Sequence, residues 1–102
     1  MLSYDLTPAA EVDLEEIARY TTLEWGPEQA TRYIDKLHEC FQKIAKQRVT
    51  GKTFSKRFPN LFVTRCEHHY MFYLHVNQTK PVIIAVLHER MDMLARLKDR
   101  LD

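Results

Sequence analysis

The spacing of apolar residues changes near residue 45, and this change constrains the fold more than any other feature. Before it, apolar or small side chains recur every three or four residues, as on the buried face of a helix. The two stripes are Ala10, Leu14, Ile17, Ala18, Thr21 and Trp25, then Ala30, Tyr33, Ile34, Leu37, Phe41, Ile44 and Ala45. Thr7-Pro8 suits a helix start, and Gly26-Pro27 separates the stripes because glycine ends helices and proline begins them. The first half is therefore predicted to be a helical hairpin.

After residue 45 the apolar residues favour strands instead. Three runs rich in β-branched and aromatic residues are separated by polar turns. These runs are Leu61–Cys66, Tyr70–Val76 and Val82–Leu87, with Glu67-His68-His69 and Asn77–Pro81 between them. The run from Val82 is apolar on both faces, as in a strand covered on at least one side. Arg48–Lys56 is interpreted as a polar loop around Gly51.

Two short elements complete the prediction. Leu2–Leu6 is expected to form a first strand, and Asp92–Leu101 has the helical spacing of a terminal helix. The predicted class is α+β, in the order N-terminal strand, helical hairpin, three-stranded antiparallel sheet and short C-terminal helix. We expect the helices to gather on one face of the sheet. Residues 1–102 are expected to form a single domain.

Composition excludes several classes of protein. The chain has 102 residues, 15 Lys and Arg against 14 Asp and Glu, and a net charge of +1, which matches an ordinary globular domain. Gly26 and Gly51 are its two glycines, so a glycine-rich phosphate loop is excluded. No apolar run approaches the roughly 18 to 20 residues of a membrane span, and the first residues lack a signal-peptide pattern. A cytoplasmic protein with no membrane association is expected.

The cysteines and the basic residues leave alternatives open. Cys40 and Cys66 lack the spacing of a zinc site, and in the cytoplasm they are expected to be reduced structural thiols rather than a disulfide. Between them lie seven basic residues and no acid: Lys43, Lys46, Arg48, Lys52, Lys56, Arg57 and Arg65. This stretch predicts a positive surface suited to phosphates or an acidic protein, or else a solvated basic loop.

Several segments together resemble the ParE toxins of bacterial type II toxin-antitoxin modules. The opening Tyr4–Ala10, Trp25-Gly26, the aromatic run His69–Tyr73 and the segment Val86–Asp92 are similar to that family and occur in the same order. Within the ParE/RelE superfamily, the resemblance implies a RelE/ParE-like fold and a toxin that inhibits DNA gyrase and is neutralised by a ParD-like antitoxin. It also implies that the toxin assembles with its antitoxin and meets DNA only through gyrase.

The RelE branch cuts messenger RNA on the ribosome and is the alternative. RNA cleavage needs a base, cations for the phosphate and an acid. Tyr70 occupies the position where RelE-like nucleases carry an arginine, Arg90 matches their later arginine, and the downstream tyrosine position falls near Arg96. A nuclease reading would therefore use Tyr70, His88 and Arg90, although a hydrogen-bonded structural role is expected for His88. The incomplete set favours binding without catalysis, and no cofactor or metal is expected.

A toxin of this kind needs two contact surfaces, which the family motifs do not themselves locate. The expected contact with gyrase is the end of the last strand and the tail: Arg90, Met91, Asp92, Arg96, Lys98 and Arg100. The expected antitoxin contact is the helical hairpin with one strand residue: Leu23, Trp25, Arg32, Tyr33, Lys36, Lys43 and Arg65. The alternatives are a tail docked only for stability, core positions for Trp25 and Tyr33, and a non-toxic adaptor that only binds a partner.

Overall fold

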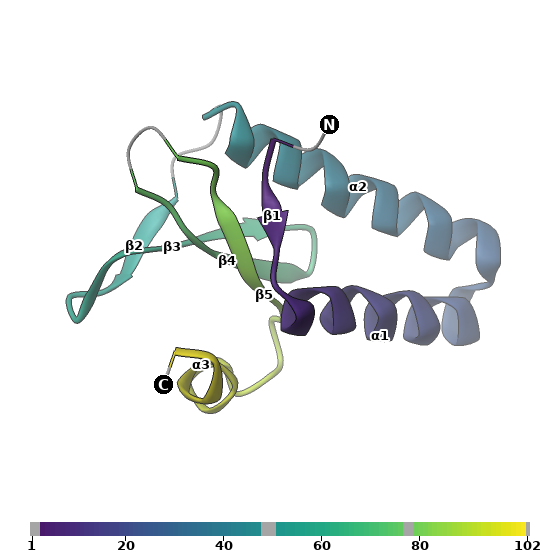
Figure 1. The fold of residues 1–102 in the computed structure, drawn as a ribbon. Helices are drawn as coiled ribbons and strands as arrows, with labels where there is room; N and C mark the ends of the chain where they lie inside the picture. The colour runs from purple at the N-terminus through teal and green to yellow at the C-terminus, as the bar shows by residue number, and fades with distance from the viewer. Residues whose placement is uncertain (1–2, 48–50, 77–78, 102) are drawn as a thin grey trace.

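The computed structural model describes residues 3–47, 51–76 and 79–101 (Figure 1). The elements are β1 (Asp5–Leu6), α1 (Pro8–Trp25), α2 (Pro27–Ala45), β2 (Lys52–Ser55), β3 (Phe58–Cys66), β4 (His69–Leu74), β5 (Val82–His88) and α3 (Met93–Leu101). This order confirms the predicted α+β class, the helical hairpin and the terminal helix. None of these described helices is long and apolar enough to cross a membrane.

The five strands form one sheet in the order β1-β5-β4-β3-β2. The central strands β3, β4 and β5 pair antiparallel as predicted, whereas β1 joins the sheet parallel to β5. The predicted first strand is shorter than expected, and its Leu2 lies outside the described residues. Asn77 and Gln78 of the predicted turn also lie outside them.

The prediction of a loop over Arg48–Lys56 is wrong for its second part. Lys52–Ser55 forms the edge strand β2, which pairs antiparallel with β3, while Arg48 lies outside the described residues. The segment resembled a loop because an edge strand with one exposed side carries polar residues such as Thr53. Lys52 is also exposed. Phe54 is therefore the one apolar residue of β2, and a single residue shows no alternation of apolar and polar side chains.

The α1–α2 hairpin covers one face of the sheet and α3 lies against the other (Figure 1). On the hairpin side, Leu37 and Phe41 of α2 pack with Met71 and Val86 of the sheet. On the opposite side, Leu97 of α3 packs in a separate cluster with strand residues. The expectation that all helices share one face is therefore wrong. The apolar run of β5 accounts for the difference, because a strand that is apolar on both sides needs cover on both.

The hairpin begins and turns as the sequence indicates. The Thr7 hydroxyl accepts a hydrogen bond from the Ala10 amide at 3.1 Å, which caps α1, and Pro8 takes the first helical position. Gly26 ends α1 with φ at 91°, a left-handed conformation that favours glycine. Pro27 then begins α2 directly. The two helices extend side by side past the edge of the sheet (Figure 1).

The cysteines are joined, which corrects the prediction of reduced thiols. Cys40 of α2 and Cys66 at the end of β3 form a disulfide that links the hairpin to the sheet. The two residues are 26 apart in sequence, so spacing gave no sign of the pairing. The fold brings them together because α2 crosses the sheet face on which the Cys66 side chain lies.

Candidate functional site

The tail after β5 carries the first predicted surface. Arg90, Met91, Arg96 and Lys98 are exposed, and Met91 keeps 41% of its surface accessible. Leu94 adds an exposed apolar side chain at 70%. Two exposed apolar side chains among cations form a surface that can bind an acidic protein partner.

Asp92 lies within this surface and also has a local structural role. Its carboxylate accepts a hydrogen bond from the Ala95 amide at 3.2 Å, and its carbonyl accepts one from Arg96. These are the contacts of a helix N-cap, so Asp92 fixes the start of α3. A substitution at Asp92 would therefore alter the helix as well as the surface.

Arg100 is held inside the protein, unlike the other tail cations. Its guanidinium donates two hydrogen bonds to the Asp13 carboxylate of α1, at 2.6 and 2.8 Å, and one to the Ile84 carbonyl at 3.0 Å. The same carboxylate accepts the Val86 amide at 2.9 Å. The hydrogen bonds to Asp13 raise the pKa of Arg100, against the effect of burial. Arg100 therefore attaches α3 to α1 and β5, and its charge is already paired.

Asp13 is a structural residue that the sequence analysis does not single out. The signal was available in the helical spacing. Asp13 lies three residues after Ala10 and four before Ile17, which places it on the buried stripe. A carboxylate at such a position indicates a buried cation partner.

The three residues of the nuclease interpretation do not converge. Tyr70 packs with the cluster on the α3 side of the sheet. His88 lies on the hairpin side, where its ring is 5.1 Å from the ring of His69. Arg90 is exposed beyond the strand, and its backbone N–H donates to the His88 Nδ1 at 3.1 Å. A base and an acid on opposite faces of a sheet cannot act on one phosphodiester.

His69 and His88 instead belong to a hydrogen-bonded cluster under the turn between β3 and β4. The hydroxyl of Tyr33 on α2 is 2.7 Å from the His69 Nδ1 and accepts a hydrogen bond from the His68 amide. Burial lowers the pKa of His69 to about 4, with the neighbouring His88 and His68 adding to the effect. Burial also raises the pKa of Tyr33. Together these contacts connect the hairpin to the sheet.

Four of the residues predicted to bind an antitoxin are exposed on the hairpin. Leu23 keeps 80% of its surface accessible and Trp25 keeps 71%, while Arg32 and Lys43 are also exposed. Trp25 continues the buried stripe of α1, but at this point the hairpin has passed the edge of the sheet. The core position considered for Trp25 is therefore wrong.

The remaining three make contacts within the protein. Tyr33 is half-buried in the histidine cluster. The Lys36 ammonium is 4.0 Å from the Glu67 carboxylate, and Arg65 donates to the Glu89 carboxylate at 2.5 Å. Glu89 is also 3.4 Å from the His68 ring. These exposed ion pairs contribute little to stability and leave the side chains free to exchange partners.

The fold occurs in a solved structure. A chain of the structure described as the chromosomal ParDE TA system from P. aeruginosa superposes with a TM-score of 0.70 at 20% identity, and the match covers 86% of this chain and 96% of that one. The chain therefore shares the fold of that structure, as the resemblance implied.

The sequence comparisons give the family. Residues 4–93 match the family described as "ParE toxin of type II toxin-antitoxin system, parDE". The chain is 46% identical to Toxin ParE of Escherichia coli over 101 residues, which is 99% of this chain and 98% of the relative. It is 31% identical to Toxin ParE1 of Mycobacterium tuberculosis (strain CDC 1551 / Oshkosh) over 90 residues, which is 88% of this chain and 92% of the relative. The chain belongs to the ParE family of type II toxins.

Proposed function

We propose that this toxin arrests growth by binding DNA gyrase and trapping it on DNA, without catalysing a reaction of its own. The observation that carries the proposal is the separation of Tyr70 and His88 onto opposite faces of the sheet, combined with membership of the ParE family. A nuclease needs these groups in one cleft, whereas inhibition by binding needs only an accessible surface. The toxin works in the cytoplasm, meets DNA only through gyrase and uses no cofactor.

The proposed gyrase contact is the outer surface of the tail, formed by Arg90, Met91, Asp92, Arg96 and Lys98, with Leu94 between them. Its cations lie on the exposed side of α3 and of the loop before it. Arg100 is left out because its guanidinium is bound to Asp13. Arginine binds phosphate or carboxylate through two parallel hydrogen bonds, so Arg90→Lys would also weaken the contact.

Growth arrest on induction tests this surface. We compare the wild type with Arg90→Ala/Lys98→Ala and with the control Arg19→Ala/Lys46→Ala, whose residues are exposed on the hairpin. The tail variant should lose most of its toxicity at equal soluble abundance, and the control should retain it. Truncation after Met91 would not test the surface alone, because it also removes the buried Leu97 and the Arg100 that pairs with Asp13. Full toxicity of the tail variant would show that the contact lies elsewhere.

A ParD-like antitoxin is the proposed neutralising partner, with which the toxin assembles. The hairpin offers Leu23, Trp25 and Arg32 at its tip as contacts for an acidic segment that folds on binding. Lys36 and Lys43 lie nearer the sheet, and β3 adds Arg65. Half-buried Tyr33 would contribute its accessible edge. Co-purification with the antitoxin should fall for Leu23→Ser/Trp25→Ser. Undiminished recovery of the complex would remove the tip from the interface.

A further inference from the structure

The disulfide between Cys40 and Cys66 is the one covalent cross-link between the hairpin and the sheet in the described part of the chain. Cys66 ends β3 and is 5% exposed, whereas Cys40 on α2 is only half-buried. Thiol reductants keep most cysteines of cytoplasmic proteins reduced. In the proposed compartment the bond therefore depends on the redox state of the cell.

The disulfide lies at one end of a seam of contacts between α2 and the turn that follows β3. The three pairs of this seam are Tyr33–His69, Lys36–Glu67 and Cys40–Cys66. Their α2 members follow at intervals of three and four residues, so they share one face of the helix, and their partners follow in the reverse order. The ion pair of the seam is exposed and therefore weak. The covalent bond thus contributes most to holding the seam in place.

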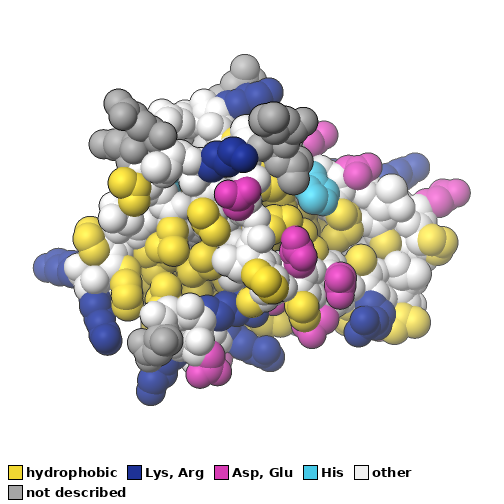
Figure 2. Space-filling view, viewed as in Figure 1, with side chains coloured by type: hydrophobic (Ala, Val, Ile, Leu, Met, Phe, Trp, Pro, Cys, Tyr) yellow, Lys and Arg dark blue, Asp and Glu magenta, His cyan; other side chains and the backbone are white. Residues whose placement is uncertain are grey.

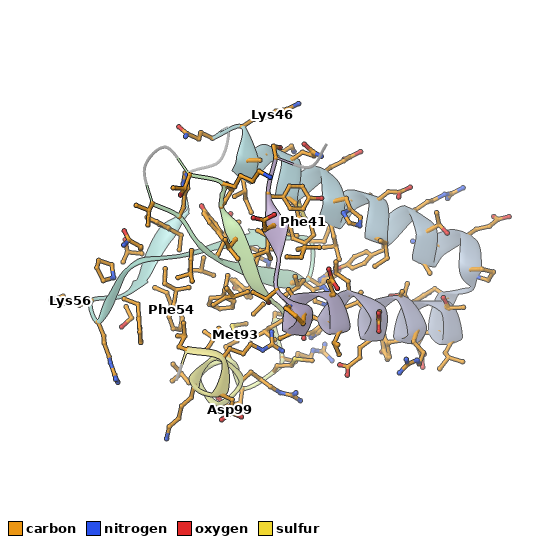
Figure 3. All side chains as sticks on the ribbon, in the orientation of Figure 1. Phe41, Lys46, Phe54, Lys56, Met93 and Asp99 are labelled. Carbon is orange, nitrogen blue, oxygen red and sulfur yellow. A yellow bond between two sulfur atoms is a disulfide. The ribbon has the colours of Figure 1, made fainter. Side chains whose placement is uncertain are left out.

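The core between hairpin and sheet does not depend on the bond. Phe41, the residue after Cys40, points from α2 toward the sheet (Figure 3) and belongs to the buried cluster on that side. The Cys66 sulfur lies 3.8 Å from the Lys36 carbonyl oxygen, so a thiol formed on reduction has an acceptor in place. The turn itself contains Glu67 with φ at 57°, a conformation that residues other than glycine adopt uncommonly. Reduction is therefore expected to keep the fold and to loosen the turn.

The seam also carries part of the proposed antitoxin contact. Tyr33 and Lys36 belong to both, and Arg65 directly precedes Cys66 in β3. α2 has as many basic as acidic residues, and Figure 2 shows side chains of both signs side by side on the hairpin. Such a surface distinguishes partners by the positions of its charges, because attraction by its net charge is small. A fixed seam therefore prepares this part of the surface for binding.

We propose that Cys40 and Cys66 form a reversible redox switch that sets the affinity of the toxin for its antitoxin. The inference rests on the proposed function, because it deepens the antitoxin contact assigned there. Oxidised toxin has a fixed seam and binds the antitoxin more tightly. Reduction loosens the seam, weakens neutralisation and increases the fraction of free toxin.

The co-reactant is a dithiol, small or protein-borne. One of its thiolates attacks the sulfur of the more accessible Cys40, which breaks the S–S bond, forms a mixed disulfide and releases Cys66 as a thiolate. The second thiolate of the dithiol then closes its own disulfide and releases Cys40. Two electrons pass from the dithiol to the cysteine pair, and the two cysteines take up the protons that the dithiol gave up.

The test measures the affinity of purified toxin for its ParD-like antitoxin in buffers poised with reduced and oxidised dithiothreitol. Thiol labelling reports the state of the pair, and circular dichroism reports whether the toxin is folded. Oxidised wild type should bind about ten-fold more tightly than reduced wild type, because the side chains of the seam are ordered before binding. The matched variant Cys40→Ser/Cys66→Ser should bind like the reduced protein at every poise.

Linkage supplies a second measurement on the wild type. If the disulfide tightens antitoxin binding ten-fold, bound antitoxin must favour the disulfide by the same factor. For a two-electron couple this is a fall of about 30 mV in the midpoint potential of the pair. Titration of the thiols with and without saturating antitoxin measures the shift.

Four results would overturn the proposal. The first is equal affinity of oxidised and reduced wild type, and the second is two free thiols at every poise. The third is a redox response that persists in Cys40→Ser/Cys66→Ser, which would place the responsive thiols on the antitoxin. The fourth is a reduced toxin that is unfolded at the assay temperature. All four leave the proposed function standing if the oxidised toxin arrests growth and is neutralised, whereas failure of neutralisation in both redox states would remove both.

Discussion

Removal of the buried Asp13 carboxylate is expected to destabilise the protein far more than removal of an exposed carboxylate from the same helix. The carboxylate accepts two hydrogen bonds from Arg100 and one from the Val86 amide. Asp13→Ala would leave a largely buried guanidinium without its counter-charge and a strand amide without its acceptor. The hydrogen bond from Arg100 to the Ile84 carbonyl would remain.

The magnitude follows from these contacts. Breaking a buried ion pair by removing one partner costs about 3 to 5 kcal/mol, and an unpaired buried amide adds about 1 to 3 kcal/mol. The Arg100 side chain keeps 18% of its surface accessible, so it can regain part of its hydration. We therefore expect a loss of about 3 kcal/mol in the free energy of unfolding. For a chain of this size that corresponds to a fall of about 15 °C in Tm.

Urea unfolding followed by circular dichroism measures the loss from the transition midpoint at constant m. Glu15→Ala is the matched control, since it removes an exposed carboxylate from the same helix and should change stability by less than about 0.5 kcal/mol. In a double-mutant cycle, Asp13→Ala and Arg100→Ala should be strongly non-additive. A shift for Asp13→Ala no larger than that of the control, or additive single losses, would refute the reasoning.

Three further predictions concern the core. Cys40→Ser, or reduction of the bond to Cys66, should lower the free energy of unfolding by about 3 kcal/mol, because the unfolded chain gains conformational entropy without the cross-link. Equal Tm values with and without dithiothreitol would contradict this. His69 has a pKa of about 4 when folded and near 6.5 when unfolded, so the unfolded chain binds more protons between these values and stability falls as pH falls. From pH 7.5 to 5 the wild type should lose about 2 kcal/mol more than His69→Gln, and parallel pH profiles would argue against the assignment. Gly51→Ala should cost about 1 to 2 kcal/mol, because the added Cβ overlaps the Tyr73 hydroxyl; an unchanged urea midpoint would contradict that overlap.

The regular parts of the fold were predictable from sequence because their patterns are local. The stripe of α2 from Ala30 to Ile44 is buried as expected, and Gly26 ends α1. The edge strand β2 was not predicted because its conformation depends on pairing with β3. The spacing of residues within a short polar segment does not show such pairing.

The predicted tail surface shows the same limit. Arg90 and Lys98 are exposed, as a binding surface requires. Arg100 is also a basic residue of the tail, but it forms an ion pair with Asp13. The difference arises from Asp13, which is 87 residues away in sequence. Long-range partners of this kind decide whether a charge is available to a ligand. The helical spacing indicates that Asp13 needs a buried cation, but it does not show that this cation is Arg100.

The central claim is that the toxin acts by holding gyrase rather than by cutting RNA. In the most direct test, the purified protein is incubated with gyrase, ATP and supercoilable plasmid. In a parallel reaction it is added to ribosomes that translate a defined message. We predict accumulation of linear plasmid with the message intact, and loss of the linear product for Arg90→Ala/Lys98→Ala. Specific cuts in the message, with supercoiling by gyrase unaffected, would contradict the account.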